Sequence, residues 1–223
     1  MIKENIQALV NEIQSVSGDR LVHLIAVSKT KTIEEIQEAI AAGITDIGEN
    51  KVQELNQKQL ALGDAVRYHM IGHLQTNKVR NVIGTVELIH SVDRSSLIEE
   101  IEKRGKAKGI VQDVLLQLNI AKEDTKSGAY EEDLPGLIEL IETKEYIRVK
   151  GLMTVAPICE NLENVRPVFR KMKEIFDQLA LMHYNNIEMV YLSMGMSHDF
   201  KAALEEGSNM IRVGSYIFGD RNY

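Results

Sequence analysis

Short apolar runs alternate with amphipathic helical patterns along the whole chain, and this alternation restricts the possible folds more than any other feature. Residues 2–16 carry apolar side chains at helical spacing, and the apolar run 23–27 that follows is too short for a helix. Thr32 and Glu35 then form a capping-box pattern, and Gly43 ends the helix that this pattern starts.

The same unit repeats to the end of the chain. Strands are predicted over residues 23–27, 46–48, 67–71, 86–90, 112–119, 149–153, 188–192 and 210–213. Helices are predicted over residues 2–16, 33–42, 50–62, 75–83, 94–106, 130–143, 161–182 and 198–206, with a short one after Gly214.

Strands that alternate with helices indicate parallel pairing through right-handed crossovers. Eight such units in 223 residues predict an α/β fold, a single (β/α)₈ TIM barrel with an extra N-terminal helix. A doubly wound open sheet has the same periodicity and is the alternative. Three prolines and no linker-like tract interrupt the chain, so residues 1–223 are predicted to form one domain.

Composition narrows the class of protein. A formal charge of −7 and a pI of 5.5 argue against nucleic acid or anionic membranes as partners, because both select a basic face. Cys159 is the one cysteine, which excludes an internal disulfide and suits a cytoplasmic protein. The N-terminal segment is too acidic for a signal peptide. The histidines are scattered without metal-ligand spacing, so no metal site is predicted. No long apolar surface stripe is left over, so we predict a monomer.

Nearly every predicted strand is followed by a polar residue or a glycine. In a barrel these carboxyl ends form one ring that carries the active site, which favours the barrel over the open sheet. Lys29 emerges directly from the first apolar strand. Apolar walls disfavour the ammonium form, so we expect a lowered pKa for Lys29 and a neutral amine able to attack an aldehyde or ketone. A lysine that only extends to solvent is the alternative.

The segments after the seventh and eighth strands predict a phosphate site. Gly195 and Ser197 follow the seventh strand, Gly214 and Ser215 follow the eighth, and both segments enter helices. Barrel enzymes frequently bind phosphate at this place, and Arg212 adds a cationic donor. Glycines that serve only as turn residues are the alternative.

An amine at the first strand and a phosphate site at the last two predict a ligand with both an aldehyde and a phosphate. Pyridoxal 5′-phosphate fits this description, and so do the phosphosugars of Schiff-base aldolases. An arginine that faces a pyridine nitrogen keeps that nitrogen unprotonated and weakens the cofactor as an electron sink. A phosphosugar offers no such atom to Arg212.

Four blocks of sequence resemble the pyridoxal-phosphate homeostasis protein family, in the family's order and across nearly the whole chain. They are residues 27–29 (VSK), 48–54 (GENKVQE), 69–78 (HMIGHLQTNK) and 192–219. The resemblance implies a barrel of the alanine-racemase type without that racemase's second, C-terminal β domain. Tyr68 stands where relatives commonly have Trp, and Ser215 where they often have Thr. We expect the first change to affect packing and the second to keep the phosphate contact.

The resemblance also implies roles for individual residues. Lys29 matches the lysine that carries pyridoxal 5′-phosphate, the vitamin B6 cofactor, as an internal aldimine. Arg212 matches the arginine that faces the pyridine nitrogen. Further cofactor-binding positions are matched by Asn50, Ser197, Gly214 and Ser215. Lys126 matches a lysine near the pocket mouth, with a plain exposed loop lysine as the alternative.

The function that the resemblance implies is pyridoxal phosphate homeostasis without established turnover. The protein would bind the cofactor and buffer it or deliver it to apo-enzymes. The alternative is a pyridoxal-phosphate-dependent amino-acid racemase, which needs a second base, usually a tyrosine from another domain or subunit. A length of 223 residues leaves no room for that domain, and among the tyrosines only Tyr216 has a suitable position. A Schiff-base aldolase is a third, weaker interpretation.

Overall fold

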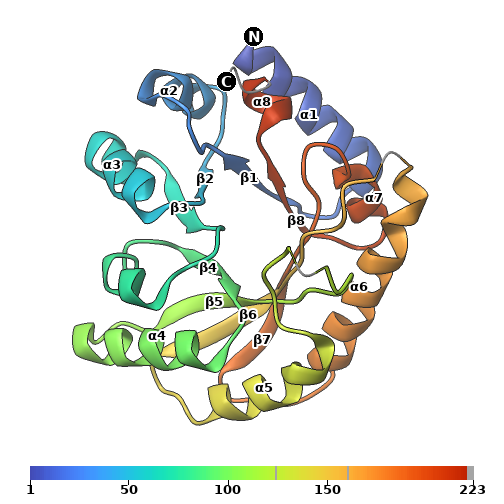
Figure 1. Cartoon of the computed structure of the whole chain (residues 1–223). Coiled ribbons are helices and arrows are strands. Elements are labelled where there is room, and N and C mark those ends of the chain that lie inside the picture. Colours follow the sequence, from blue (N-terminus) through green and yellow to red (C-terminus); the bar gives the residue numbers. More distant parts are fainter. Residues whose placement is uncertain (124, 160, 220–223) are drawn as a thin grey trace.

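The computed structural model describes residues 1–123, 125–159 and 161–219, and its strands close into a barrel (Figure 1). Every strand is parallel to its neighbours in chain order, and the first pairs with the last. The strands are β1 (His23–Val27), β2 (Asp46–Glu49), β3 (Arg67–Met70), β4 (Leu88–Val92), β5 (Gln112–Gln117), β6 (Ile147–Met153), β7 (Ile187–Ser193) and β8 (Met210–Val213). The predicted TIM barrel is confirmed, and the open sheet is wrong.

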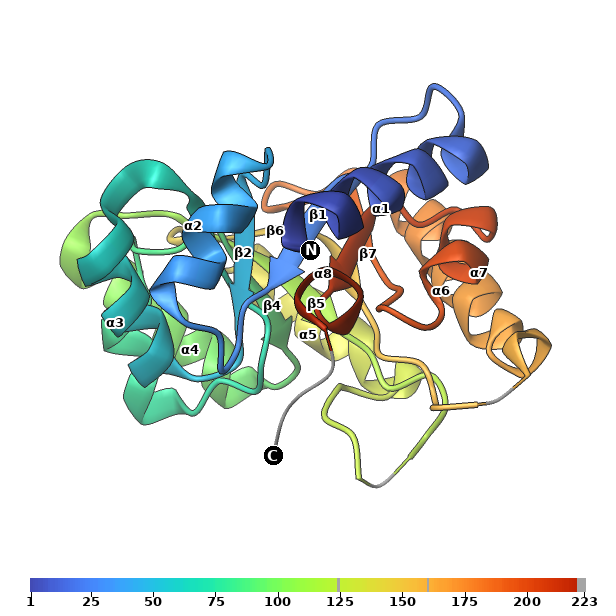
Figure 2. The ribbon, with the colours of Figure 1, turned by 90° about the horizontal axis from the view of Figure 1, so that it is seen from above.

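Helices surround the barrel, and an additional one precedes β1. They are α1 (Ile2–Ser17), α2 (Ile33–Ala41), α3 (Val52–Leu62), α4 (Ser95–Lys108), α5 (Leu134–Glu142), α6 (Arg166–Ala180), α7 (Phe200–Glu205) and α8 (Ser215–Phe218). The Thr32 capping box predicted from the sequence is present at the start of α2. Helix α1 lies against α7 and α8 (Figure 2), where the Asn5 side chain donates to the Ile217 carbonyl at 3.0 Å.

Three predicted helices differ in extent. Residues 75–83 form only a short 3₁₀ helix, Thr76–Asn81, although Val79, Val82 and Ile83 are all buried. The helices predicted over 130–143 and 161–182 begin later, at α5 and α6. Pro135 and Pro167 lie in their first turns, where the missing N–H and the fixed φ are favourable. Each proline therefore marks a helix start that periodicity had placed too early.

The apolar core has two parts, one inside the barrel and one between the barrel and the helices. The outer part is the larger and covers the outward faces of the strands. The inner part consists of Ile25, Leu88, Leu115, Met153 and Met210. This small inner cluster leaves room for polar side chains near the carboxyl ends of the strands, where barrel proteins place their sites.

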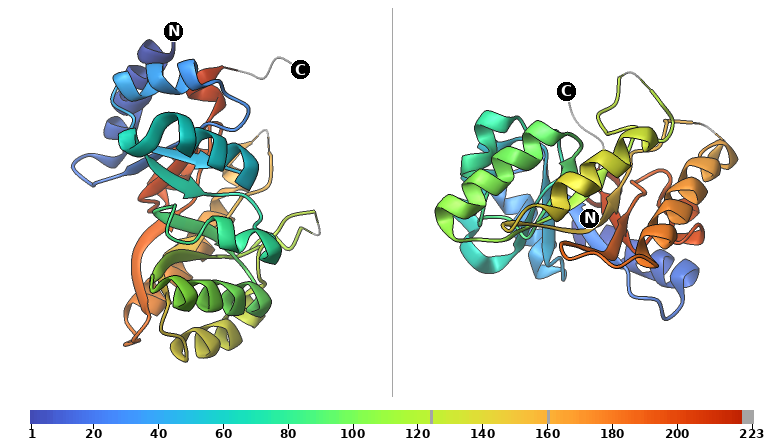
Figure 3. Two further views of the ribbon diagram at one scale, coloured as in Figure 1. Left: turned by 90° about the vertical axis from the view of Figure 1, so that its left-hand side faces the viewer. Right: turned by 90° about the horizontal axis from the view of Figure 1, so that it is seen from below.

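The two longest connections lie at the carboxyl ends of strands, after β5 and after β6. The described residues between β5 and α5 and between β6 and α6 extend away from the barrel on the same side (Figure 3). In the described part of the chain, no helix is both long enough and apolar enough to cross a membrane.

Candidate functional site

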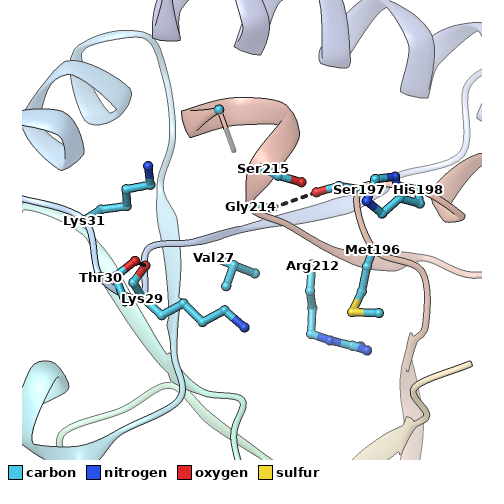
Figure 4. A pocket seen from close by; sticks show the side chains of 11 residues that line it. Val27, Lys29, Thr30, Lys31, Met196, Ser197, His198, Arg212, Gly214 and Ser215 are labelled. Carbon is cyan, nitrogen blue, oxygen red and sulfur yellow. Dashed lines mark hydrogen bonds between the residues drawn. The ribbon is translucent and has the colours of Figure 1, made fainter. Parts of the chain in front are cut away.

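A cavity opens at the carboxyl ends of β1, β7 and β8. Five of the residues predicted from the sequence line it together: Lys29, Ser197, Arg212, Gly214 and Ser215. Lys29 and Arg212 extend into the same space, with Ser197 and Ser215 along one wall (Figure 4). The remaining lining residues are Val27, Thr30, Lys31, Met196, His198 and Gly219. A shared cavity requires all three strand ends to meet, which the closed barrel provides.

The backbone that carries Lys29 is held in place from both sides. Ser28 is fully buried, its hydroxyl donates to Glu49 Oε1, and its carbonyl accepts from Lys58 Nζ at 2.6 Å. On the other side, Thr30 has a φ of 66°, a left-handed conformation that is unfavourable for a β-branched residue. The Thr30 N–H donates to Glu54 at 2.8 Å, which helps to hold this strained turn. Lys29 therefore leaves a backbone of defined geometry.

Glu49 and Lys58 form a buried ion pair behind Lys29 that sequence reasoning missed. Both side chains are almost entirely buried, and Glu49 Oε2 has no hydrogen-bond partner among the described residues. Burial raises the pKa of Glu49, against the hydrogen bonds from Lys58 and Ser28 that lower it. A signal was present in the sequence, because Lys58 falls on the apolar stripe of α3 between Leu55 and Leu62. A lysine at such a position needs a buried partner.

Arg212 lies inside the barrel with 4% of its surface exposed. Its guanidinium donates to the Ser193 hydroxyl at 2.5 Å and to the Thr154 carbonyl at 2.8 Å. Burial lowers the pKa of Arg212 to about 10, against a smaller opposing effect of Asp199, so the group keeps its charge at neutral pH. Arg212 is thus a fixed cationic donor at the inner wall of the cavity.

The wall formed by the ends of β7 and β8 carries small polar groups. Ser197 Oγ accepts from the Gly214 N–H at 3.2 Å and from the Tyr216 N–H at 3.4 Å. A Cβ at Gly214 would stand 3.3 Å from Val27, so glycine allows this close approach of β8 to β1. The loop is held by Asp199, which accepts from the Met196 N–H at 2.6 Å. Ser197, Gly214 and Ser215 thus line this wall, and the backbone N–H groups of Gly214 and Tyr216 fix the Ser197 hydroxyl there.

Asn50 and Lys126 lie outside this cavity. Asn50 follows β2 and lines a neighbouring cavity with Lys51, Val52, Gln53, Met70, His73, Gln75 and Lys78. Lys126 is only partly exposed, since its amine donates to the Ala156 carbonyl at 2.7 Å and pairs with Glu123 at 2.7 Å. Lys126 therefore ties the β5–α5 segment to the β6–α6 segment and is not a plain exposed lysine.

The donor set of the main cavity is one of an amine, a guanidinium, hydroxyls and backbone N–H groups. Among the described residues, no group of three or more His, Cys, Asp or Glu is arranged to hold a metal ion. Such donors suit an anion together with a group that an amine can attack. The geometry thus defines a barrel with a lysine-containing site for a small phosphorylated ligand.

Comparison with known proteins agrees with this class. Residues 2–222 match the family model described as the alanine racemase N-terminal domain, and the chain belongs to that family. Within it, the chain is 45% identical over 207 residues to the pyridoxal phosphate homeostasis protein of Aquifex aeolicus, covering 92% of this chain and 90% of that one. The corresponding protein of Pseudomonas aeruginosa is 37% identical over 203 residues, with 91% and 86% covered.

Solved structures give the same relationship. The structure of PipY from Synechococcus elongatus with pyridoxal phosphate bound superposes with a TM-score of 0.88 at 31% identity, covering 98% of this chain and 100% of that one. Alanine racemase from Streptomyces coelicolor shares the fold, with a TM-score of 0.74 at 19% identity, and the match covers 98% of this chain and 59% of the racemase. The resemblance found in the sequence motifs is therefore confirmed.

Proposed function

We propose that this chain binds pyridoxal 5′-phosphate and serves in its homeostasis, holding the cofactor and buffering it or delivering it to apo-enzymes. The observation that carries the proposal is the convergence of Lys29 and Arg212 on one cavity beside the Ser197–Gly214 wall. Relatives at 37–45% identity are named pyridoxal phosphate homeostasis proteins, and PipY was solved with the cofactor bound. When bound, the cofactor supplies an aldehyde that reacts reversibly with amines.

The residues present match the three functional groups of the cofactor. The amine of Lys29 would form the covalent link to the aldehyde carbon, with loss of one water. Arg212 would donate to the ring nitrogen, and a donor that stays charged at neutral pH keeps this nitrogen unprotonated. Ser197, Ser215 and the backbone of Gly214 would hold the phosphate. Asn50 lines only the neighbouring cavity and so is matched to none of these three groups.

The position of Tyr216 favours a carrier over a racemase. Its hydroxyl donates to Glu12 on α1 at 2.7 Å, and the side chain is not among those that line the cavity. The hydrogen bond to Glu12 also raises the pKa of Tyr216, so the hydroxyl stays protonated and less phenolate is present at neutral pH to accept a proton. The tyrosine that the sequence offered as a second base is therefore engaged on the outside of the barrel.

We propose that residues 1–223 act as a single-domain cytoplasmic monomer.

Borohydride reduction tests the assignment of Lys29. The wild-type protein mixed with pyridoxal phosphate should become yellow, and reduction should fix one cofactor to the peptide that contains Lys29, as measured by mass spectrometry. Lys29→Ala should show no fixed cofactor. Lys31→Ala is the matched control, because Lys31 lines the same cavity and should leave the label in place. Equal labelling of wild type and Lys29→Ala would refute the assignment.

Incubation of the loaded protein with L-alanine distinguishes the two functions. A carrier should leave the L enantiomer unchanged over many hours, as followed by chiral chromatography. Sustained formation of D-alanine, at many turnovers per protein molecule, would show that the protein is a racemase and contradict the carrier function.

A further inference from the structure

Five polar side chains form a continuous line through the inside of the barrel, from its amino end to Arg212. Asp46 Oδ1 lies 2.9 Å from His69 Nε2, and His69 Nδ1 lies 3.1 Å from His90 Nε2. His90 Nδ1 lies 3.4 Å from Ser193 Oγ, which accepts from Arg212 at 2.5 Å. The line begins at the first residue of β2 and crosses β3, β4 and β7 before it reaches β8.

The line is buried over most of its length. His90 and Ser193 are fully buried, and His69 is 3% exposed. They lie beside the apolar cluster that fills the rest of the barrel, so each polar atom needs a partner within the line. Both ends of the line border cavities: Asp46, which is 9% exposed, borders one at the amino end together with Arg67 and Asp113, and Arg212 borders the main cavity. A polar line of this kind is costly to bury unless its members satisfy one another.

The chemistry of the two ends sets the direction of every hydrogen bond. Arg212 can only donate, so Ser193 Oγ accepts from it and has its own hydrogen available for His90 Nδ1. At the other end, burial acts to raise the pKa of Asp46, but hydrogen bonds from His69, Arg67 and Thr45 outweigh it and hold the pKa below its usual range. Asp46 is therefore a carboxylate that only accepts, and His69 carries its hydrogen on Nε2.

The two histidines complete the direction between these ends. Burial, together with the nearby His69 and Arg212, holds the pKa of His90 far below its usual range, so His90 is neutral. A neutral His90 that accepts from Ser193 at Nδ1 carries its hydrogen on Nε2 and donates to His69 Nδ1. Each of the three middle members, Ser193, His90 and His69, then donates once and accepts once along the line. The reverse order would require a doubly protonated His69.

We propose that Asp46 is a remote counterion of Arg212, and that His69, His90 and Ser193 are positioning residues which transmit this interaction as a one-way chain of hydrogen bonds. The inference rests on the proposed function, in which Arg212 contacts the ring nitrogen of the cofactor. In the described part of the protein no carboxylate lies within ion-pair distance of Arg212, and Asp199 acts on it only from farther away. The line of hydrogen bonds adds Asp46 as a second negative group that is connected to the guanidinium. The guanidinium is thereby fixed in orientation with its remaining donors toward the cavity.

Nitrogen-15 NMR of the histidine side chains tests the chain directly. The protein at pH 7, without and with added pyridoxal phosphate, should show both His69 and His90 as neutral Nε2–H tautomers, with His69→Gln and His90→Gln used for assignment. A donor at the Ser193 end and a carboxylate at the Asp46 end require this tautomer at both positions. An Nδ1–H tautomer or an imidazolium at either position would overturn the proposal.

Cofactor affinity gives the second measurement. Asp46→Asn removes the negative end of the chain and should weaken the binding of pyridoxal phosphate about fivefold, the lower end of the usual coupling between distant sites. Asp113→Asn is the matched control. Asp113 borders the same amino-end cavity, but it pairs with Arg148 and is not part of the line of hydrogen bonds. It should leave affinity unchanged. Equal affinities of Asp46→Asn and wild type, or equal losses in both variants, would refute the role of Asp46.

The two proposals fail in different ways. If borohydride fixes no cofactor to Lys29 but the histidines are both Nε2–H, the proposed function is wrong and the chain of hydrogen bonds stands as a structural feature. If Lys29 is labelled but the tautomers differ, only the inference about Asp46 fails.

Discussion

The two ends of the barrel use charged residues in opposite ways, and strand β2 shows the contrast within four residues. At its amino end, Asp46 lies near the surface and accepts hydrogen bonds from Arg67, whose side chain is more than half exposed. At its carboxyl end, Glu49 is fully buried against Lys58 and supports the backbone beside Lys29. The ion pair at the amino end links two neighbouring strands and has one exposed partner. The ion pair at the carboxyl end is buried and supports the backbone of the site.

Other ion pairs of the amino end follow the pattern of Asp46. Arg148 pairs with Asp113 across β6 and β5, and Lys150 pairs with Glu188 across β6 and β7. Such exposed pairs contribute little to stability. A buried pair behaves differently, because removal of one partner leaves an unpaired charge in an apolar environment. Loss of a charged residue should therefore destabilise the protein more at the buried Glu49–Lys58 pair beside the site than at the exposed pairs of the amino end.

Removal of one lysine from each end should produce the largest difference. Lys58→Met strands Glu49 in the interior and should lower the free energy of unfolding by about 3–5 kcal/mol. Lys150→Met leaves Glu188 in solvent and should cost about 0–1 kcal/mol. Urea unfolding at pH 7 measures both values. Similar losses for the two variants would show that the ends do not differ in this respect.

Substitution of one glycine at each end should give a smaller difference. Gly195, with φ of 99°, would place a Cβ 2.7 Å from Ala203, so Gly195→Ala combines backbone strain with overpacking and should cost about 3 kcal/mol. Gly43, with φ of 104°, has open space around it, so Gly43→Ala should cost about 1 kcal/mol.

Thermal unfolding measures both glycine variants. Cofactor binding should weaken only in Gly195→Ala, because the Gly195 carbonyl accepts from the Arg212 N–H at 3.0 Å. A larger effect at Gly43 would contradict the comparison between the two ends.

The two carboxyl groups of β2 should affect the pH dependence of stability with opposite signs. The folded-state pKa of Asp46 is lowered, so its contribution is complete above about pH 4 and is lost as the pH falls further. The folded-state pKa of Glu49 is raised, so the folded state binds the extra proton and stability falls as the pH rises above about 4.

Unfolding curves between pH 2 and 7 check these signs. The stability advantage of wild type over Asp46→Asn should grow as the pH rises through the acid range. The corresponding advantage over Glu49→Gln should shrink between about pH 4 and neutrality. If the free energy of unfolding of wild type and of one variant changed in parallel with pH, the carboxyl group replaced in that variant would not contribute to the pH dependence of stability.

Much of the site could be predicted because it depends on strand ends. The bounds of β1 and β8 agree with the predicted ones, since their apolar runs are short and clearly bounded. Once eight strands alternate with helices, Lys29, Ser197 and Arg212 must meet at one end of the barrel. Asn50 could not be placed in the same way, because the direction of a loop side chain depends on contacts that strand spacing does not describe.

The interior of the barrel could not be predicted by the same reasoning. Lys58 meets Glu49 because α3 packs on β2, and His69 meets His90 because β3 and β4 pair in one register. A shift of one residue in a strand turns each side chain to the other face. In the sequence, His69 and His90 lie far apart, and their spacing gives no sign that the two side chains meet.

By itself the sequence determined the alternation of elements, the closed barrel that follows from it and the polar groups at the strand ends, because periodicity and capping are local properties. Only the tertiary structure decided which polar groups are buried together. Strand register and helix packing bring Asp46, His69, His90, Ser193 and Arg212 into one line across five strands. Contacts between such distant residues depend on the stagger of the strands around the barrel, which no local pattern specifies.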